Sequence, residues 1–115
     1  MEITKLESID ALNAFTAANT NALVIVSRNN CAGCNALDGA LKTNAELQNA
    51  LAGAQVAVVK LEDVPAIATT FGLRMAPSMI LFREDDEAAR LTGFEGASKL
   101  INAAREHFSD LAVAA

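Results

Sequence analysis

The stretch that most constrains the fold of this 115-residue chain is Leu23–Asp38, which reads LVIVSRNNCAGCNALD. It opens with four apolar residues, three of them β-branched, and a run without alternation is typical of a central strand covered on both faces. A polar corner follows, and we expect a helix to begin near Cys31. The chain's only two cysteines, Cys31 and Cys34, therefore fall where a strand passes into a helix. Two thiols at this spacing can close a local disulfide and reopen it, which predicts electron exchange with other thiols.

Length and composition narrow the class of protein. A chain of this size with 52% hydrophobic and 20% charged residues is expected to fold as one domain. Its net charge of −5 and scattered cations argue against nucleic acid as a partner. No apolar run approaches the roughly 18 residues of a membrane span, and the first ten residues are acidic and polar, unlike a secretion signal. We therefore expect a cytoplasmic protein, where a lone CxxC is more often catalytic than structural.

The remaining elements follow from apolar periodicity and from turn residues. Further strands are expected at Glu2–Lys5, Gln55–Leu61, Ser78–Phe82 and Ala88–Thr92. Further helices are expected after an N-cap at Ser8, from Pro65 to Gly72, and from Ser98 to Phe108. The order β-α-β-α-β-α-β-β-α predicts parallel pairing early, and a charged turn at Arg83–Glu87 predicts an antiparallel pair late. We expect one domain over residues 1–108, followed by a tail at 109–115.

One segment has two interpretations. Thr43 and Glu46 are spaced as a capping box, which predicts a second helix from there to about Ala52. The alternative is a single helix that bends at Gly39.

Three segments together resemble the thioredoxin family, and the likeness covers residues 1–108. They are LVIVSRNNCAGC, then GLRMAPSMILF at residues 72–82, and Thr92-Gly93-Phe94 before the last helix. Gly39 falls where many members have a helix-kinking proline. The resemblance implies a three-layer α/β/α sandwich with a central mixed sheet.

The resemblance also implies roles for individual residues. Cys31 matches the exposed, attacking cysteine, and Cys34 matches the buried, resolving one. Pro77 matches a proline that lies against the disulfide after a cis bond, and Ala76 matches the residue whose backbone pairs with an extended substrate. Substrate binding would extend to Gly93 and Met75.

The chemistry of Cys31 follows from its place at a helix N-terminus, where backbone N–H groups and the helix dipole lower the pKa of a thiol. Arg28 would add to this effect if its side chain turned toward the sulfur; the alternative is a solvated arginine.

The motif departs from the family pattern at several positions. Ile25 stands where many members have a buried aspartate, which leaves Lys60 to snorkel or to pair with Glu62. Asn30 replaces a common tryptophan. Ala32 and Gly33 replace the usual Gly-Pro, a change expected to alter the reduction potential.

The expected function is thiol–disulfide exchange on protein disulfides by a monomer, with electrons supplied by a thioredoxin-reductase-type enzyme or by small thiols. No cofactor or metal is expected, because tetrahedral zinc needs four ligands and the chain offers two thiols and a distant His107. The alternatives for the motif are a zinc site shared between two chains and a CxxC without a function. One alternative is a glutaredoxin-like, glutathione-dependent enzyme. Another is a binding module with the same fold that docks partners without turnover.

Overall fold

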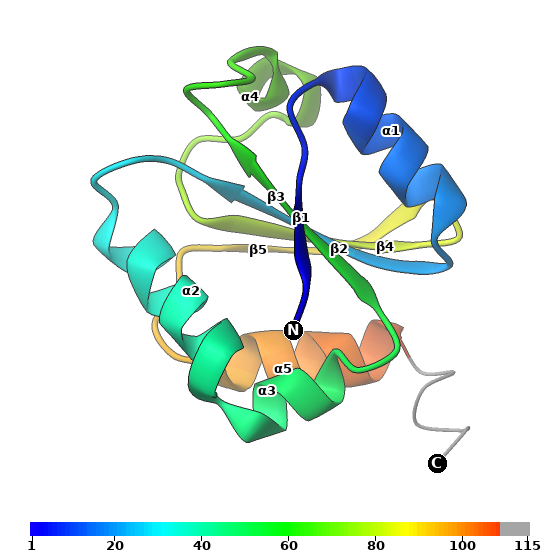
Figure 1. Ribbon diagram of the computed structural model, residues 1–115, viewed down its shortest axis with the longest axis vertical. Helices are drawn as coiled ribbons and strands as arrows, with labels where there is room; N and C mark the ends of the chain where they lie inside the picture. The colour runs from blue at the N-terminus through cyan, green and yellow to red at the C-terminus, as the bar shows by residue number, and fades with distance from the viewer. Residues whose placement is uncertain (109–115) are drawn as a thin grey trace.

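The computed structural model describes residues 1–108 and has a five-stranded mixed sheet between two layers of helices (Figure 1). The strands are β1 (Ile3–Lys5), β2 (Asn21–Ser27), β3 (Gln55–Lys60), β4 (Ser78–Arg83) and β5 (Asp86–Thr92). Their order across the sheet is β1-β3-β2-β4-β5. β3 runs parallel to β1 and β2, whereas β4 runs antiparallel to β2 and β5. The predicted three-layer architecture is confirmed.

The helices divide between the two faces of the sheet. One face is covered by α1 (Ile9–Ala18) and α4 (Ala66–Phe71). The other is covered by α2 (Ala32–Thr43), α3 (Ala45–Ala50) and α5 (Ser98–His107). Each face has its own apolar cluster, so the sheet is buried on both sides.

β2 lies at the centre of the sheet, as its sequence predicts. Its first six residues are all buried. Val24 and Val26 pack into the cluster below α1 and α4, while Leu23 and Ile25 pack into the cluster below α2 and α5. An apolar run without alternation is needed because both faces of the strand are covered.

The second helix of the ambiguous segment is a separate element, but its predicted cap is wrong by one residue. Asn44 caps α3, and its Oδ1 accepts a hydrogen bond from the Leu47 N–H at 3.0 Å. Thr43 ends α2 instead, and its hydroxyl donates to the Gly39 carbonyl at 2.8 Å. Both residue types can cap a helix, and the back-bond to Gly39 occupies the threonine hydroxyl.

The hairpin between β4 and β5 is tighter than the expected turn at Arg83–Glu87. Arg83 pairs directly with Asp86, which leaves a two-residue turn of Glu84 and Asp85 with φ values of 52° and 69°. Such a turn normally favours Asn or Gly. Here the buried Thr16 hydroxyl donates to Asp85 Oδ1 at 2.7 Å and ties the turn to α1.

The helix ends elsewhere agree closely with the sequence. Ser8 caps α1 by accepting from the Ala11 N–H at 2.9 Å. Gly72 ends α4 in the left-handed conformation, although Pro65 precedes that helix instead of being its first residue. None of the helices between residues 1 and 108 is long and apolar enough to cross a lipid bilayer. The expected tail at 109–115 lies outside the described residues.

Candidate redox site

The sheet register brings four segments of the chain to one end of the molecule. Ser27, the last residue of β2, pairs with Lys60 of β3. Because β4 runs antiparallel, its first residue Ser78 lies opposite Val26 and is paired on its other side with Thr92 of β5. The segment after β2 that contains the cysteines is therefore placed beside the segment before β4 and the one after β5.

Cys31 and Cys34 form a disulfide across the first turn of α2. Their Cα atoms are 5.2 Å apart, within the ordinary range for a disulfide. Cys31 is the N-cap residue of α2, and its Sγ accepts a hydrogen bond from the Cys34 N–H at 3.2 Å. The Cys31 sulfur thus takes the place that a Ser or Asp oxygen takes in an ordinary N-cap. The predicted pairing of the two thiols is confirmed.

The expected difference in exposure between the two cysteines is absent from this disulfide form. Cys31 is 5% exposed and Cys34 is 7% exposed, so both are buried. Cys31 is covered by the segment before β4, whose Ala76 carbonyl oxygen lies 3.6 Å from its Sγ. Exposure therefore does not distinguish the two sulfurs, whereas the N-cap hydrogen bond does.

The segment before β4 is held against the start of α2. The peptide bond between Ala76 and Pro77 is cis. The Cδ of Pro77 lies 3.1 Å from the position that a Cβ would take at Gly33. A side chain at Gly33 would have to displace the proline ring, so this close approach accounts for a glycine between the cysteines. The Gly93 N–H donates to the Pro77 carbonyl at 2.8 Å and ties the segment to the end of β5.

A groove of about 530 Å³ opens beside this segment, and we call it the Met75 groove. Its apolar lining comprises Met75, Met79, Leu91, Phe94 and Leu100. Met75 is 51% exposed. A Cβ at Gly93 would lie 3.9 Å from the Met75 sulfur, so the two residues are neighbours. At the groove's edge, hydrogen bonding to Glu87 raises the pKa of Arg90, which stays cationic.

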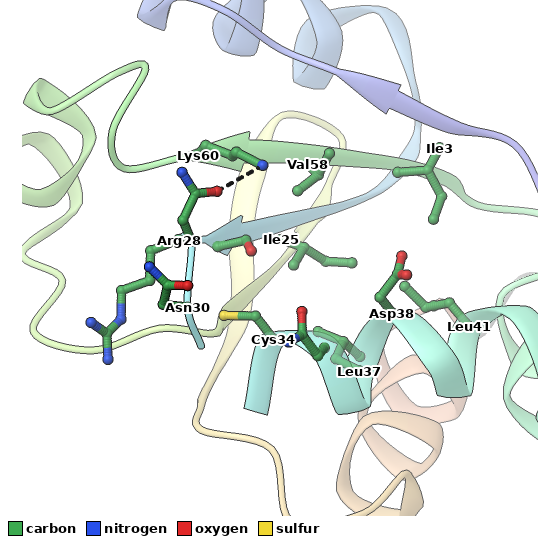
Figure 2. A pocket seen from close by; sticks show the side chains of 13 residues that line it. Ile3, Ile25, Arg28, Asn30, Cys34, Leu37, Asp38, Leu41, Val58 and Lys60 are labelled. Carbon is green, nitrogen blue, oxygen red and sulfur yellow. Dashed lines mark hydrogen bonds between the residues drawn. The ribbon is translucent and has the colours of Figure 1, made fainter. Parts of the chain in front are cut away.

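A second hollow of about 340 Å³ lies beside Cys34, and we call it the Cys34 cavity (Figure 2). Its lining includes Ile25, Arg28, Asn30, Cys34 and Lys60. The Arg28 side chain is exposed and extends away from the Cys34 sulfur (Figure 2). The alternative of a guanidinium turned toward the sulfur is not adopted.

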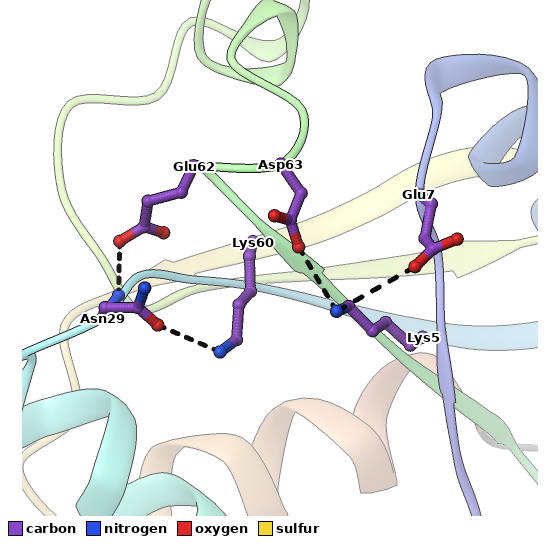
Figure 3. A network of polar contacts seen from close by, with 6 residues as sticks. All are labelled: Lys5, Glu7, Asn29, Lys60, Glu62 and Asp63. Carbon is purple, nitrogen blue, oxygen red and sulfur yellow. Dashed lines mark hydrogen bonds and ion pairs between the residues drawn. The ribbon is translucent and has the colours of Figure 1, made fainter.

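Lys60 and Glu62 are linked through Asn29 and do not pair with each other (Figure 3). The Lys60 ammonium donates to Asn29 Oδ1 at 3.0 Å, and the Asn29 backbone N–H donates to Glu62 Oε2 at 2.6 Å. Sequence reasoning interpreted Asn29 only as a turn residue and missed this role. The only sequence signal for this role was the amide side chain of Asn29, close to the CxxC motif.

Two further predicted residues lie at the corner itself. Asn30 has a φ of 53°, a left-handed conformation that asparagine tolerates better than most residues. Ala32 is the exposed first residue of α2. Over residues 1–108, no three side chains of His, Cys, Asp or Glu gather where they could share a metal ion.

Comparisons with known proteins agree with this geometry. A family model described as Thioredoxin matches residues 5–106. A thioredoxin from Chlamydia caviae is 29% identical over 104 residues, which are 90% of this chain and 97% of that protein.

Solved structures show the same fold at lower identity. The Trypanosoma brucei brucei thioredoxin has a TM-score of 0.82 at 12% identity, covering 94% of this chain and 92% of its own. A mutant thioredoxin from Halobacterium salinarum has a TM-score of 0.79 at 22% identity, covering 92% and 90%. Together with a closed Cys-X-X-Cys disulfide, the family match leads to one conclusion: this chain belongs to the thioredoxin family and is a thiol–disulfide oxidoreductase.

Proposed function

We propose that this oxidoreductase reduces disulfides of other proteins, with Cys31 as the attacking cysteine and Cys34 as the resolving one. The observation that carries the proposal is the N-cap position of Cys31, whose sulfur accepts the Cys34 N–H at 3.2 Å. In the reduced protein, the same N–H and the dipole of the 12-residue helix α2 favour the Cys31 thiolate. Cys34 lies inside the first turn, where its sulfur does not meet these unpaired N–H groups.

The reaction moves two electrons in two steps. The Cys31 thiolate attacks one sulfur of the partner disulfide, a bond from Cys31 to the partner forms, and the other partner sulfur leaves as a thiolate that takes up a proton. Cys34 then loses its proton and attacks the Cys31 sulfur. The Cys31–Cys34 disulfide forms, the second partner sulfur leaves, and the partner is fully reduced.

The segment before β4 supports a substrate site in an extended conformation. Among residues 1–108, no acceptor engages the Ala76 N–H. An extended partner segment could pair with it, as an added strand pairs with a sheet edge. Met75 and Gly93 flank the same place and would contact the partner's side chains. Pro77 and Gly33 would fix the distance between the partner segment and the sulfurs.

Other residues support the site at a distance from the sulfurs. Asn30 and Ala32 shape the corner from which Cys31 projects, and Arg28 and Lys60 supply positive charge near the motif. Electrons reside on the two sulfurs, so the proposal includes no metal or organic cofactor.

We propose further that the protein acts as a monomeric single domain of residues 1–108 in the cytoplasm. Both cysteines belong to the redox pair, and none remains for the structural disulfides typical of secreted proteins. A thioredoxin-reductase-type enzyme or a small thiol would return electrons to the disulfide.

The test is reduction of insulin, supported by NADPH with a thioredoxin reductase and, separately, by dithiothreitol. We expect turnover by the natural chain and none above background by Cys31→Ser. The Lys5→Gln variant, whose lysine pairs with Asp63 at 3.3 Å and lines neither the Cys34 cavity nor the Met75 groove, is the control and should retain turnover. Insulin reduction that persists in Cys31→Ser would overturn the proposal.

A further inference from the structure

The cations of this acidic protein differ in what they contact. Lys5, Lys42, Arg90 and Arg105 each lie within 4.0 Å of a carboxylate oxygen. In the part of the chain that the structure describes, Arg28, Lys60, Arg74 and Lys99 have no such ion pair. Arg28 and Lys60 line the Cys34 cavity and Arg74 lies on the segment before β4, and we call these three the basic rim.

The positions of the rim residues follow from the fold. Arg28 lies three residues before Cys31 and lines the Cys34 cavity with Lys60 (Figure 2). Arg74 is exposed and lies two residues before Ala76, whose carbonyl faces the Cys31 sulfur. The rim therefore reaches from the corner after β2 to the segment before β4.

The acidic groups near the rim do not cancel it. Asp38 pairs with Lys42 at 2.8 Å, whereas Glu62 accepts only the neutral Asn29 N–H and keeps its negative charge. That single carboxylate is outnumbered by the three cations of the rim. Glu95 and Lys99 both line the Met75 groove, so its lining contains an ammonium as well as a carboxylate. The rim thus gives the disulfide a positive surrounding on a chain whose net charge is −5.

We propose that the basic rim selects partner proteins whose reactive disulfide is flanked by aspartate or glutamate. Unpaired cations attract a carboxylate approaching the sulfurs, while the negative charge of the remaining surface repels it from unproductive faces. Charge arranged in this way orients an encounter and raises its rate about 10-fold or more at low salt. The inference rests on the proposed function, since it names the partners of that same site.

The experiment measures the second-order rate constant between the reduced protein and synthetic peptides that each contain one disulfide. Three peptides of equal length have Glu, Gln or Lys residues beside the disulfide. Because the chain has no Trp or Tyr, the reaction is stopped with acid and its products are counted by mass spectrometry. We expect the Glu peptide to react about tenfold faster than the Lys peptide at ~0.01 M ionic strength, and the ratio to approach one near ~1 M.

Two double variants of equal net charge locate the effect. In Arg28→Gln/Arg74→Gln, the Glu-to-Lys rate ratio should fall to about two, and Arg28→Lys/Arg74→Lys should restore it. In Lys5→Gln/Arg105→Gln, which removes two ion-paired cations elsewhere, the ratio should stay that of the natural chain. The ratio cancels any change in the intrinsic reactivity of Cys31.

Three results would overturn the inference: equal rates for the Glu and Lys peptides, a preference that salt does not weaken, or an unchanged ratio in Arg28→Gln/Arg74→Gln. A neutral small disulfide, bis(2-hydroxyethyl) disulfide, separates these from a failure of the proposed function. If the natural chain reduces it but shows no charge preference, the function stands and the basic rim has no selective role.

Discussion

The Cys34 cavity and the Met75 groove lie on either side of one disulfide and differ in what they offer to a partner. The Cys34 cavity has an apolar floor that includes Ile25 and polar walls that include the Lys60 ammonium. Lys60 and Glu62 are both hydrogen-bonded to Asn29, so these polar groups already have partners within the chain. The Met75 groove offers exposed apolar surface beside the Ala76 N–H, for which residues 1–108 supply no acceptor. This difference supports the proposal that a partner contacts the Met75 side while the Cys34 side provides charge.

The largest effect of a substitution is expected on the Cys34 side, at Ile25. This side chain is 4% exposed and belongs to the apolar cluster below α2. Ile25→Asp should lower the free energy of unfolding by about 3 kcal/mol, because a carboxylate there loses its water and the cations of the cavity lining, Lys60 and Arg28, are at its wall and not beside residue 25 in the core. Urea denaturation followed by circular dichroism measures the change.

The matched control is Ile25→Val, which removes one methylene and should cost about 1 kcal/mol. Equal losses in the two variants would mean that water already reaches the floor of the Cys34 cavity and that stability does not depend on its being apolar.

Partner binding on the Met75 side can be tested at Gly93, whose φ is 76°. A β-branched residue in this left-handed conformation costs roughly 1–2 kcal/mol of stability. Its methyl groups would also approach the Met75 sulfur, which lies 3.9 Å from the Cβ position. We expect Gly93→Val to raise the KM for insulin several-fold, with a smaller effect on bis(2-hydroxyethyl) disulfide.

Gly72→Val separates crowding from strain in that experiment. Gly72 has a φ of 65°, with no atom within 4 Å of its Cβ position, and it ends α4 away from the groove. This variant should lose similar stability and keep its KM. If both variants raised the KM equally, the groove would have no part in binding.

The smallest effect on stability is expected at Asn29, on the Cys34 side. Asn29→Ala removes the acceptor of the Lys60 ammonium, but Asn29 is exposed and water can replace the lost bond. We expect a loss of about 0.5 kcal/mol in the free energy of unfolding, and recovery in Asn29→Asp, which keeps an acceptor. A loss above ~2 kcal/mol would show that this link is part of the core structure and is not a surface contact.

Much of the fold could be predicted because local patterns and tertiary packing agree. The apolar run of β2 is buried on both faces, and the Ser8 cap and the Gly72 stop act through their own backbone neighbours. The pairing of Cys31 with Cys34 is equally local, since one helical turn separates them.

The misses have two physical causes: competition between neighbouring residues of similar chemistry, and contacts between residues distant in sequence. Thr43 and Asn44 can both cap a helix, and only the bond from Thr43 back to Gly39 decides between them. The Cys31 sulfur is contacted by the Ala76 carbonyl, which lies 45 residues further along the chain. Composition and spacing do not contain such contacts.

Covalent trapping tests the central claim most directly, because it asks which sulfur attacks first. Reduced Cys34→Ser and reduced Cys31→Ser are each mixed with a disulfide-containing protein, and adducts are located by peptide mapping. The account predicts a stable mixed disulfide on Cys31 in the first variant and little adduct in the second. Faster adduct formation at Cys34 in the second variant would contradict it.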